Sequence, residues 1–168
     1  SEDGITVTGS GTATAPPDVV RIILAAESTE STMQSALDTA TAGVTAMRTA
    51  LADAGIADAD LRSTEASLWS GQSQPDGALR HTARFGLEAT VRSVADAGRV
   101  VTGALKAAGE TGRMNGMSFA HSDPSSLQAQ AREKAVDAAR GKAAQLAALT
   151  GRALGEVREV AEGPVGAG

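Results

Sequence analysis

The feature that most constrains this chain is one long helix near its C-terminus, predicted over residues 125–150. Asp123 can cap its first turn, Pro124 suits the first helical position, and Gly151 follows the last turn. Because both ends are marked by residues that start or stop helices, the segment is fixed as one continuous element of about seven turns.

The apolar side of this helix is built mostly from alanine. At 100° per residue one side collects Leu127, Ala131, Ala135, Ala138, Ala139, Leu146 and Leu149, and charged residues collect on the other. Since alanine side chains are short, this stripe predicts a helix that packs closely against a sheet.

Two further helices are predicted earlier in the chain. Residues 31–54 carry apolar residues at alternating four- and three-residue spacing. Ser31 and Gln34 form a capping box there, and Gly55 marks the end. A second helix is predicted between Ser93, a capping residue, and Gly109. The regular seam of the first helix is typical of packing on the chain's own sheet, because three heptads are short for a coiled coil.

Strands are predicted from period-two alternation and, for residues 19–27, from a nearly all-apolar, β-branched run that is typical of a strand covered on both faces. They span residues 5–15, 19–27, 61–69, 80–92, 114–120 and 154–162. The first two are expected to form a hairpin across the Pro16-Pro17-Asp18 turn. Gly9-Ser10-Gly11 lacks the Gly-Lys-Ser/Thr of a phosphate loop, so its glycines indicate a bulge or a close backbone approach.

The clearest strand is 80–92, which predicts a sheet with one covered and one polar face. His81, Ala83, Phe85, Leu87, Ala89 and Val91 point one way, and Arg84, Glu88, Thr90 and Arg92 point the other. The element order is ββα-ββα-βαβ, which predicts an α+β fold with helices on one face of a largely antiparallel sheet. We expect a single domain over residues 1–162 and a flexible tail over 163–168.

Composition excludes several function classes. The net charge is −5, which disfavours nucleic-acid and anionic-membrane partners. No apolar run reaches the length of about 20 residues that a membrane span needs. The absence of cysteine removes disulfides, thiolate catalysis and zinc–cysteine sites. The chain begins at Ser1 without methionine, so we expect a trimmed product, for which a removed signal peptide is one explanation.

The search for chemistry yields no catalytic, cofactor-binding or metal site. No Gly-x-Ser-x-Gly elbow occurs, and the two histidines, His81 and His121, lie forty residues apart in sequence. With Asp123 they could hold a divalent ion, although no ligand spacing supports such a site. Trp69, the only tryptophan, stands beside the polar loop 71–77. Trp69, His81 and His121 are therefore candidates for partner or ligand contact.

Two segments of the long helix stand out, residues 131–135 (Ala-Arg-Glu-Lys-Ala) and 138–143 (Ala-Ala-Arg-Gly-Lys-Ala). With these segments the chain resembles the SIMPL-domain family, which includes bacterial periplasmic immunogenic proteins. Residues 5–11, Pro17-Asp18 and 115–119 follow the family's order elsewhere. One departure is the absence of tyrosine from the strand that ends at Val91.

The resemblance implies an exported or lipid-anchored bacterial protein with a poorly defined, loosely stress-related role. We therefore expect a non-enzymatic protein outside the cytoplasm, in the periplasm, the cell envelope or secreted. It would act through self-assembly or a protein partner, and a lipid anchor before Ser1 is compatible with the sequence. The alternative is a binder of small apolar ligands, and a hydrolase or metal enzyme using His81 and His121 is a third hypothesis. No cofactor is expected.

Overall fold

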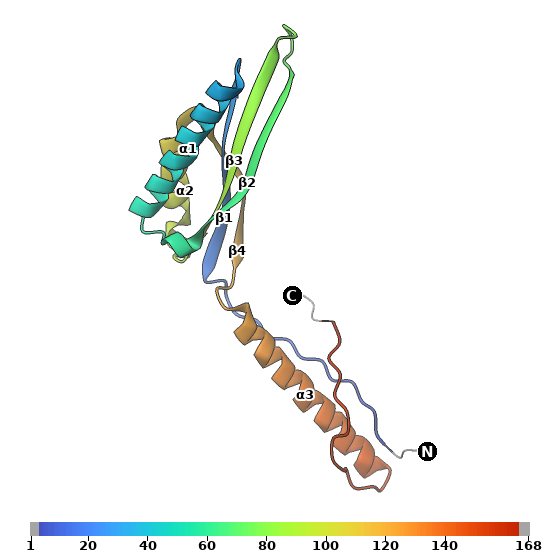
Figure 1. Cartoon of the computed structure of the whole chain (residues 1–168). Helices are drawn as coiled ribbons and strands as arrows, with labels where there is room; N and C mark the ends of the chain where they lie inside the picture. The colour runs from blue at the N-terminus through green and yellow to red at the C-terminus, as the bar shows by residue number, and fades with distance from the viewer. Residues whose placement is uncertain (1–3, 165–168) are drawn as a thin grey trace. The chain divides into compact units, whose positions relative to one another are not determined.

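A computed structural model describes residues 4–164, and the chain divides into two compact units (Figure 1). The larger unit is continuous from Pro17 to Ser122. The smaller one combines the N-terminal residues up to Pro16 with the residues from Asp123 onward. The prediction of one domain over residues 1–162 stays a prediction, and residues 165–168 of the predicted tail lie outside the described part.

The larger unit is a four-stranded antiparallel sheet with two helices. The strands lie side by side in the order β2-β3-β1-β4. The elements are β1 (Val19–Glu30), α1 (Met33–Asp53), β2 (Leu61–Gln72), β3 (Leu79–Val91), α2 (Ala97–Ala108) and β4 (Gly112–Ala120). This order confirms the predicted α+β class and the antiparallel sheet.

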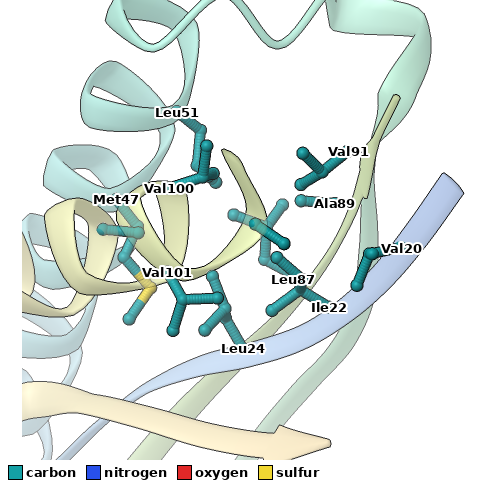
Figure 2. Packing of buried hydrophobic residues seen from close by; sticks show 12 residues of the cluster. Val20, Ile22, Leu24, Met47, Leu51, Leu87, Ala89, Val91, Val100 and Val101 are labelled. Atoms are coloured by element: carbon teal, nitrogen blue, oxygen red, sulfur yellow. The ribbon is translucent and has the colours of Figure 1, made fainter. Parts of the chain in front are cut away.

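Both helices of this unit pack on the same face of the sheet, and the core lies between them and the strands (Figures 1 and 2). The largest fully buried side chains are Val19, Val20, Ile22, Leu24, Met47, Leu51, Leu87 and Val91. Leu24 on β1 stands directly opposite Leu87 on β3, and Met47 reaches this pair from α1. The alternation predicted for residues 80–92 is confirmed, because Leu87, Ala89 and Val91 all belong to this core.

The helix ends show how local sequence sets the boundaries. Thr32, not the predicted Ser31, caps α1, since its hydroxyl accepts a hydrogen bond from the Ser35 N–H at 3.1 Å. The predicted Ser31–Gln34 capping box is therefore wrong by one residue. Gly55 ends α1 with a φ of 91°, as the sequence predicts. Ser93 precedes a 3-10 turn, and the α-helical part of α2 starts at Ala97.

The smaller unit is built on α3 (Pro124–Leu149), which begins and ends where the sequence predicts. Asp123 accepts a hydrogen bond from the Ser126 N–H at 3.1 Å, Pro124 occupies the first turn, and Gly151 follows with a φ of 65°. Residues 4–16, here called the N-terminal segment, lie extended along this helix (Figure 1). Two lysines of α3 hold the segment: Lys134 Nζ donates to the Thr12 carbonyl and Lys142 Nζ to the Thr8 carbonyl.

Three predictions about this unit are wrong. The N-terminal segment forms no hairpin with β1, which pairs with β3 and β4 instead. Residues 154–162 make no strand within the described chain. The predicted alanine stripe of α3 meets no sheet among the described residues of its unit. Ala143 and Ala147 are buried, and Ala131, Ala135 and Ala139 are half-buried where Gly9 and Gly11 of the N-terminal segment approach them. For the N-terminal segment and α3 the local pattern predicts the conformation but not the partner, whereas the weaker alternation of residues 154–162 does not predict even their conformation.

Asp18 joins the start of β1 to the end of β4. Its carboxylate accepts hydrogen bonds from the N–H of Ser122, at 2.7 Å, and from the Ser122 hydroxyl, while its own N–H donates to the Ala120 carbonyl. The Ser122 hydroxyl and N–H lower the pKa of Asp18 from its ordinary 3.8, and the charge of His121 adds to this. The carboxylate therefore contributes stability in its ionised form.

We predict that Asp18→Asn lowers the free energy of unfolding at pH 6 and that this difference shrinks below about pH 4. A depressed folded-state pKa gives stability that is present above the unfolded pKa and lost as the pH falls through the folded value. Urea denaturation of both proteins at pH 6, 4 and 3 measures the difference. Ser122→Ala, which removes the hydroxyl donor, should weaken this pH dependence; an equal difference at every pH would contradict the assignment.

Candidate interaction surfaces

Strand β4, at the edge of the sheet, carries three large apolar side chains that stay substantially exposed in the described chain. Met114, Met117 and Phe119 stand opposite Leu24, Ile22 and Val20, so they lie on the helix-bearing face of the sheet. The two methionines are about half exposed, and Phe119 is 64% exposed. We call these three residues the β4 edge surface. Because β4 is the last strand of its sheet, its outer backbone groups are also without a neighbouring strand.

The opposite edge of the same sheet is protected differently. Strand β2 carries Arg62 and Glu65, and both charges are engaged by residues of β3. Its register with β3 is also broken by a bulge between Ser63 and Glu65. Charges and bulges are the features by which natural sheets discourage edge-to-edge pairing. Strand β4 also has a bulge, at Asn115 in its pairing with β1, but it carries a single charged residue, Arg113, so it is the edge less protected by charge.

The sheet face away from the helices carries a row of charges that crosses all four strands. Arg84 on β3 donates to Glu27 on β1 at 2.8 Å and to Glu65 on β2 at 3.1 Å. Arg113 on β4 lies 3.9 Å from the second oxygen of Glu27. Arg84 is the least exposed member of this row. The polar face predicted from residues 84–92 is thus confirmed as a face of paired charges.

Hydrogen bonds within this row, and one from Ser67 beside it, shift two pKa values. The Glu27 carboxylate, with Glu65 beside it, raises the pKa of Arg84. The Ser67 hydroxyl and then Arg84 lower the pKa of Glu65. Both groups are therefore held in their charged forms at neutral pH, and the row acts as a structural tie between the strands.

Trp69 lies on this same polar face, near the end of the β2–β3 hairpin. It stands opposite Thr82, whose hydroxyl shares a 2.8 Å hydrogen bond with that of Thr29. The indole side chain is 47% exposed. Trp69 is thus available for contact from the solvent side, although no second large apolar residue of β2 or β3 accompanies it on this face.

The two histidines are far apart. His81 pairs with Glu30 at one end of β1, and its Nδ1 lies 2.7 Å from the Ser70 hydroxyl. His121 follows Ala120, which pairs with Val19 at the other end of β1. At about 3.3 Å per residue these ends are roughly 36 Å apart. The structure therefore does not bring His81 and His121 into one site, and a shared metal or catalytic centre has no geometric support.

Within residues 4–164, no three side chains of the metal-binding types gather in one place. A shallow, open groove of about 600 Å³ lies on the outer side of α1 and α2, lined by Ala42, Thr45, Ala46, Thr49, Ala50, Asp53 and Ala107. The space between the helices and the sheet, where a small apolar ligand could be expected to bind, is filled by core side chains such as Met47 and Val101. None of the described helices is both long and apolar enough to span a bilayer.

The β4 edge surface was missed as a site, although its signal was present in the sequence. The strand prediction for residues 114–120 already places Met117 and Phe119 on one side. That prediction does not show that β4 is an edge strand, because this depends on the order of strands in the sheet.

Comparison with known proteins identifies the family of this chain. The SIMPL family model, described as a protein of unknown function (DUF541), matches residues 5–168. The chain therefore belongs to the SIMPL family, and the match includes both compact units. No curated protein matches the sequence.

Proposed function

We propose that this protein is a non-enzymatic component of the bacterial cell envelope, or a secreted protein, that acts through self-assembly or contact with a protein partner. The β4 edge surface carries the proposal. An edge strand with an unpaired outer backbone and three exposed apolar side chains can bind another protein surface. At the opposite edge of the same sheet, β2 carries paired charges, so we expect no association there.

Molar mass in solution, measured by light scattering at two protein concentrations, tests this proposal. We expect a multiple of 16.8 kDa. Phe119→Glu should weaken the association about tenfold or more, because the interface would have to bury an unpaired carboxylate. Ser118→Glu is the matched control. Ser118 is the adjacent residue on the opposite face, where it pairs with Arg21 and can accommodate a carboxylate.

Two results would count against self-assembly at β4. One is a wild-type protein that stays at 16.8 kDa at both concentrations. The other is an assembly that Phe119→Glu and Ser118→Glu weaken equally. Circular dichroism of both variants confirms that the larger unit remains folded in each comparison.

The location outside the cytoplasm, like the link to stress tolerance, rests on the family resemblance. Cell fractionation of the full-length gene product, combined with protease treatment of spheroplasts, tests the location. Digestion from outside supports a periplasmic or surface location, whereas protection until the inner membrane is lysed would place the protein in the cytoplasm.

The alternative of a small apolar ligand has one feature in its favour, the alanine-rich groove on α1 and α2. This groove is open and shallow, whereas small-molecule sites enclose most of their ligand. A thermal-shift screen with lipids and small metabolites separates the two functions. A ligand that raises the melting temperature without changing the molar mass would favour the binder.

A further inference from the structure

The N-terminal segment has the extended, alternating pattern of a β-strand but is not part of a sheet in the described chain. Its burial alternates residue by residue: Val7, Gly9, Gly11 and Ala13 are partly covered along α3, while Thr6, Thr8, Ser10, Thr12 and Thr14 are exposed. This period of two is that of a strand with one face packed. Yet residues 4–16 make no backbone-to-backbone hydrogen bond with any described residue. Apart from the Thr8 and Thr12 carbonyls, the segment's backbone polar groups thus have no hydrogen-bond partner among the described residues.

One edge of the segment is already occupied. In a strand, the N–H and C=O of alternate residues point to opposite edges. Lys142 and Lys134 bind the carbonyls of Thr8 and Thr12, at 2.8 and 3.1 Å, so the edge formed by the even-numbered residues faces these ammonium groups. The other edge, which we call the open edge, presents the backbone groups of the odd-numbered residues and makes no hydrogen bond with any described residue.

The open edge also lacks the features that keep strands apart. No charged residue and no proline occurs between Ile5 and Ala15. Gly9 and Gly11 cannot carry side chains, because a Cβ on Gly9 would lie 2.6 Å from the Ala139 nitrogen and one on Gly11 2.6 Å from the Ala135 nitrogen. The segment is thus held flat against α3, with an uncharged edge turned outward. Such an edge is a template for another strand.

The sequence of the segment indicates which strand fits. Residues 6–14 read Thr-Val-Thr-Gly-Ser-Gly-Thr-Ala-Thr, which is the same in both directions except for the exchange of Val7 and Ala13. Two antiparallel strands related by a two-fold axis require matching residues at equal distances from that axis. A palindrome centred on Ser10 meets this requirement.

We propose that the N-terminal segment pairs with the same segment of a second copy of this chain, antiparallel and centred on Ser10. Gly9 then exchanges backbone hydrogen bonds with Gly11 of the second copy, and Val7 with Ala13, all through the open edge. Thr8 faces Thr12 and Ser10 faces Ser10 on the exposed side, without any like charges opposed. Threonine pairs of this kind are favourable across strands. The two α3 helices lie on one face of the resulting ribbon.

The spacing of the helices is compatible with this ribbon. Paired strands lie about 4.8 Å apart, whereas packed helices need roughly 8–10 Å. Each α3 must therefore lie toward the outer edge of its own strand. The lysine contacts of Lys134 and Lys142 are on that outer edge, opposite to the one that pairs.

Because the chain has no cysteine, single cysteines test the register directly. Ser10→Cys places two thiols opposite each other at a non-hydrogen-bonded pair, where the Cα atoms are about 4.5 Å apart and a disulfide can form. Under mild oxidation of the full-length chain we expect a covalent dimer. Thr8→Cys is the matched control. Its two thiols would lie roughly 14 Å apart along the ribbon, so it should cross-link at least tenfold less.

A mixture of the Thr8→Cys and Thr12→Cys proteins should restore cross-linking, since these positions face each other only between copies. Ser10→Glu, which opposes two carboxylates, should weaken association about tenfold relative to Ser10→Thr. Equal cross-linking of Ser10→Cys and Thr8→Cys, or a Ser10→Cys protein that stays monomeric and reduced, would overturn the pairing.

This inference deepens the proposed function and rests on it, but the two fail differently. A protein that light scattering shows to be assembled, and in which Ser10→Cys does not cross-link, disproves the strand pairing and leaves self-assembly intact. If the protein is monomeric at every concentration and Ser10→Cys stays unreacted, both the strand pairing and self-assembly are disproved. Pairing of the segment with a strand of another protein would appear as protection of the Ser10→Cys thiol only when that protein is added.

Discussion

Leu87→Ala should lower the free energy of unfolding by about 2–5 kcal/mol. Leu87 lies on β3, one of the two inner strands, and its side chain is fully buried opposite Leu24 (Figure 2). Truncation removes apolar contacts with both the sheet and the helices and leaves a cavity among Met47, Val101 and their neighbours. Since domains of this size are stable by only about 5–15 kcal/mol, the loss is a large fraction of the total.

Urea denaturation followed by far-ultraviolet circular dichroism measures this effect. Leu79→Ala is the matched control, because it makes the same substitution in the same strand at a position that is 57% exposed. We expect its effect to stay within about 0.5 kcal/mol. If both variants lost the same stability, the core would not be centred where the structure places it.

The core of the larger unit could be predicted from sequence because its signals are local. Alternation along residues 80–92 gives the buried face of β3, and the spacing of Ala40, Met47 and Leu51 gives that of α1. Glycines after both helices fix where they stop. The N-cap was displaced by one residue because Ser31 and Thr32 are both good capping residues, and only backbone geometry decides between them.

What the sequence could not determine is which strand pairs with which. The pattern of residues 5–15 predicts an extended conformation and a packed face, and both are observed along α3. The expected hairpin with β1 is absent, since both edges of β1 are taken by β3 and β4. Pairing is a contact between distant residues, and period-two alternation carries no information about it.

For the candidate surfaces too, local pattern is predictable from sequence and strand pairing is not. Trp69 and His81 are both candidates from the sequence, and they belong to neighbouring pairs of the β2–β3 ladder, yet their side chains lie on opposite faces of the sheet. Successive residues of a strand alternate sides, so closeness along the ladder does not make a shared site. The β4 edge surface needed the strand order, which no local pattern supplies.

Gly9→Val should separate the N-terminal segment from α3. A Cβ at this position would collide with the Ala135 carbonyl and lie 2.6 Å from the Ala139 nitrogen, and both are helix backbone atoms that cannot rotate away. Overpacking of this kind costs on the order of 1–3 kcal/mol. Because the described segment is held to α3 by packing at its glycines and by two lysine contacts, this cost is large enough to release it. We expect amide hydrogen exchange in α3 to accelerate by about ten- to a hundredfold.

Gly155→Val is the control within the same unit, since a Cβ on Gly155 has no neighbour within 4 Å and should leave exchange in α3 unchanged. In the Ser10→Cys background the two glycine substitutions become a sharper test. The segment presents its open edge only while α3 holds it extended, so Gly9→Val should abolish the covalent dimer and Gly155→Val should preserve it. Rapid exchange in α3 combined with undiminished cross-linking would show that the strand forms without its helix. The pairing would then depend on the palindromic sequence alone.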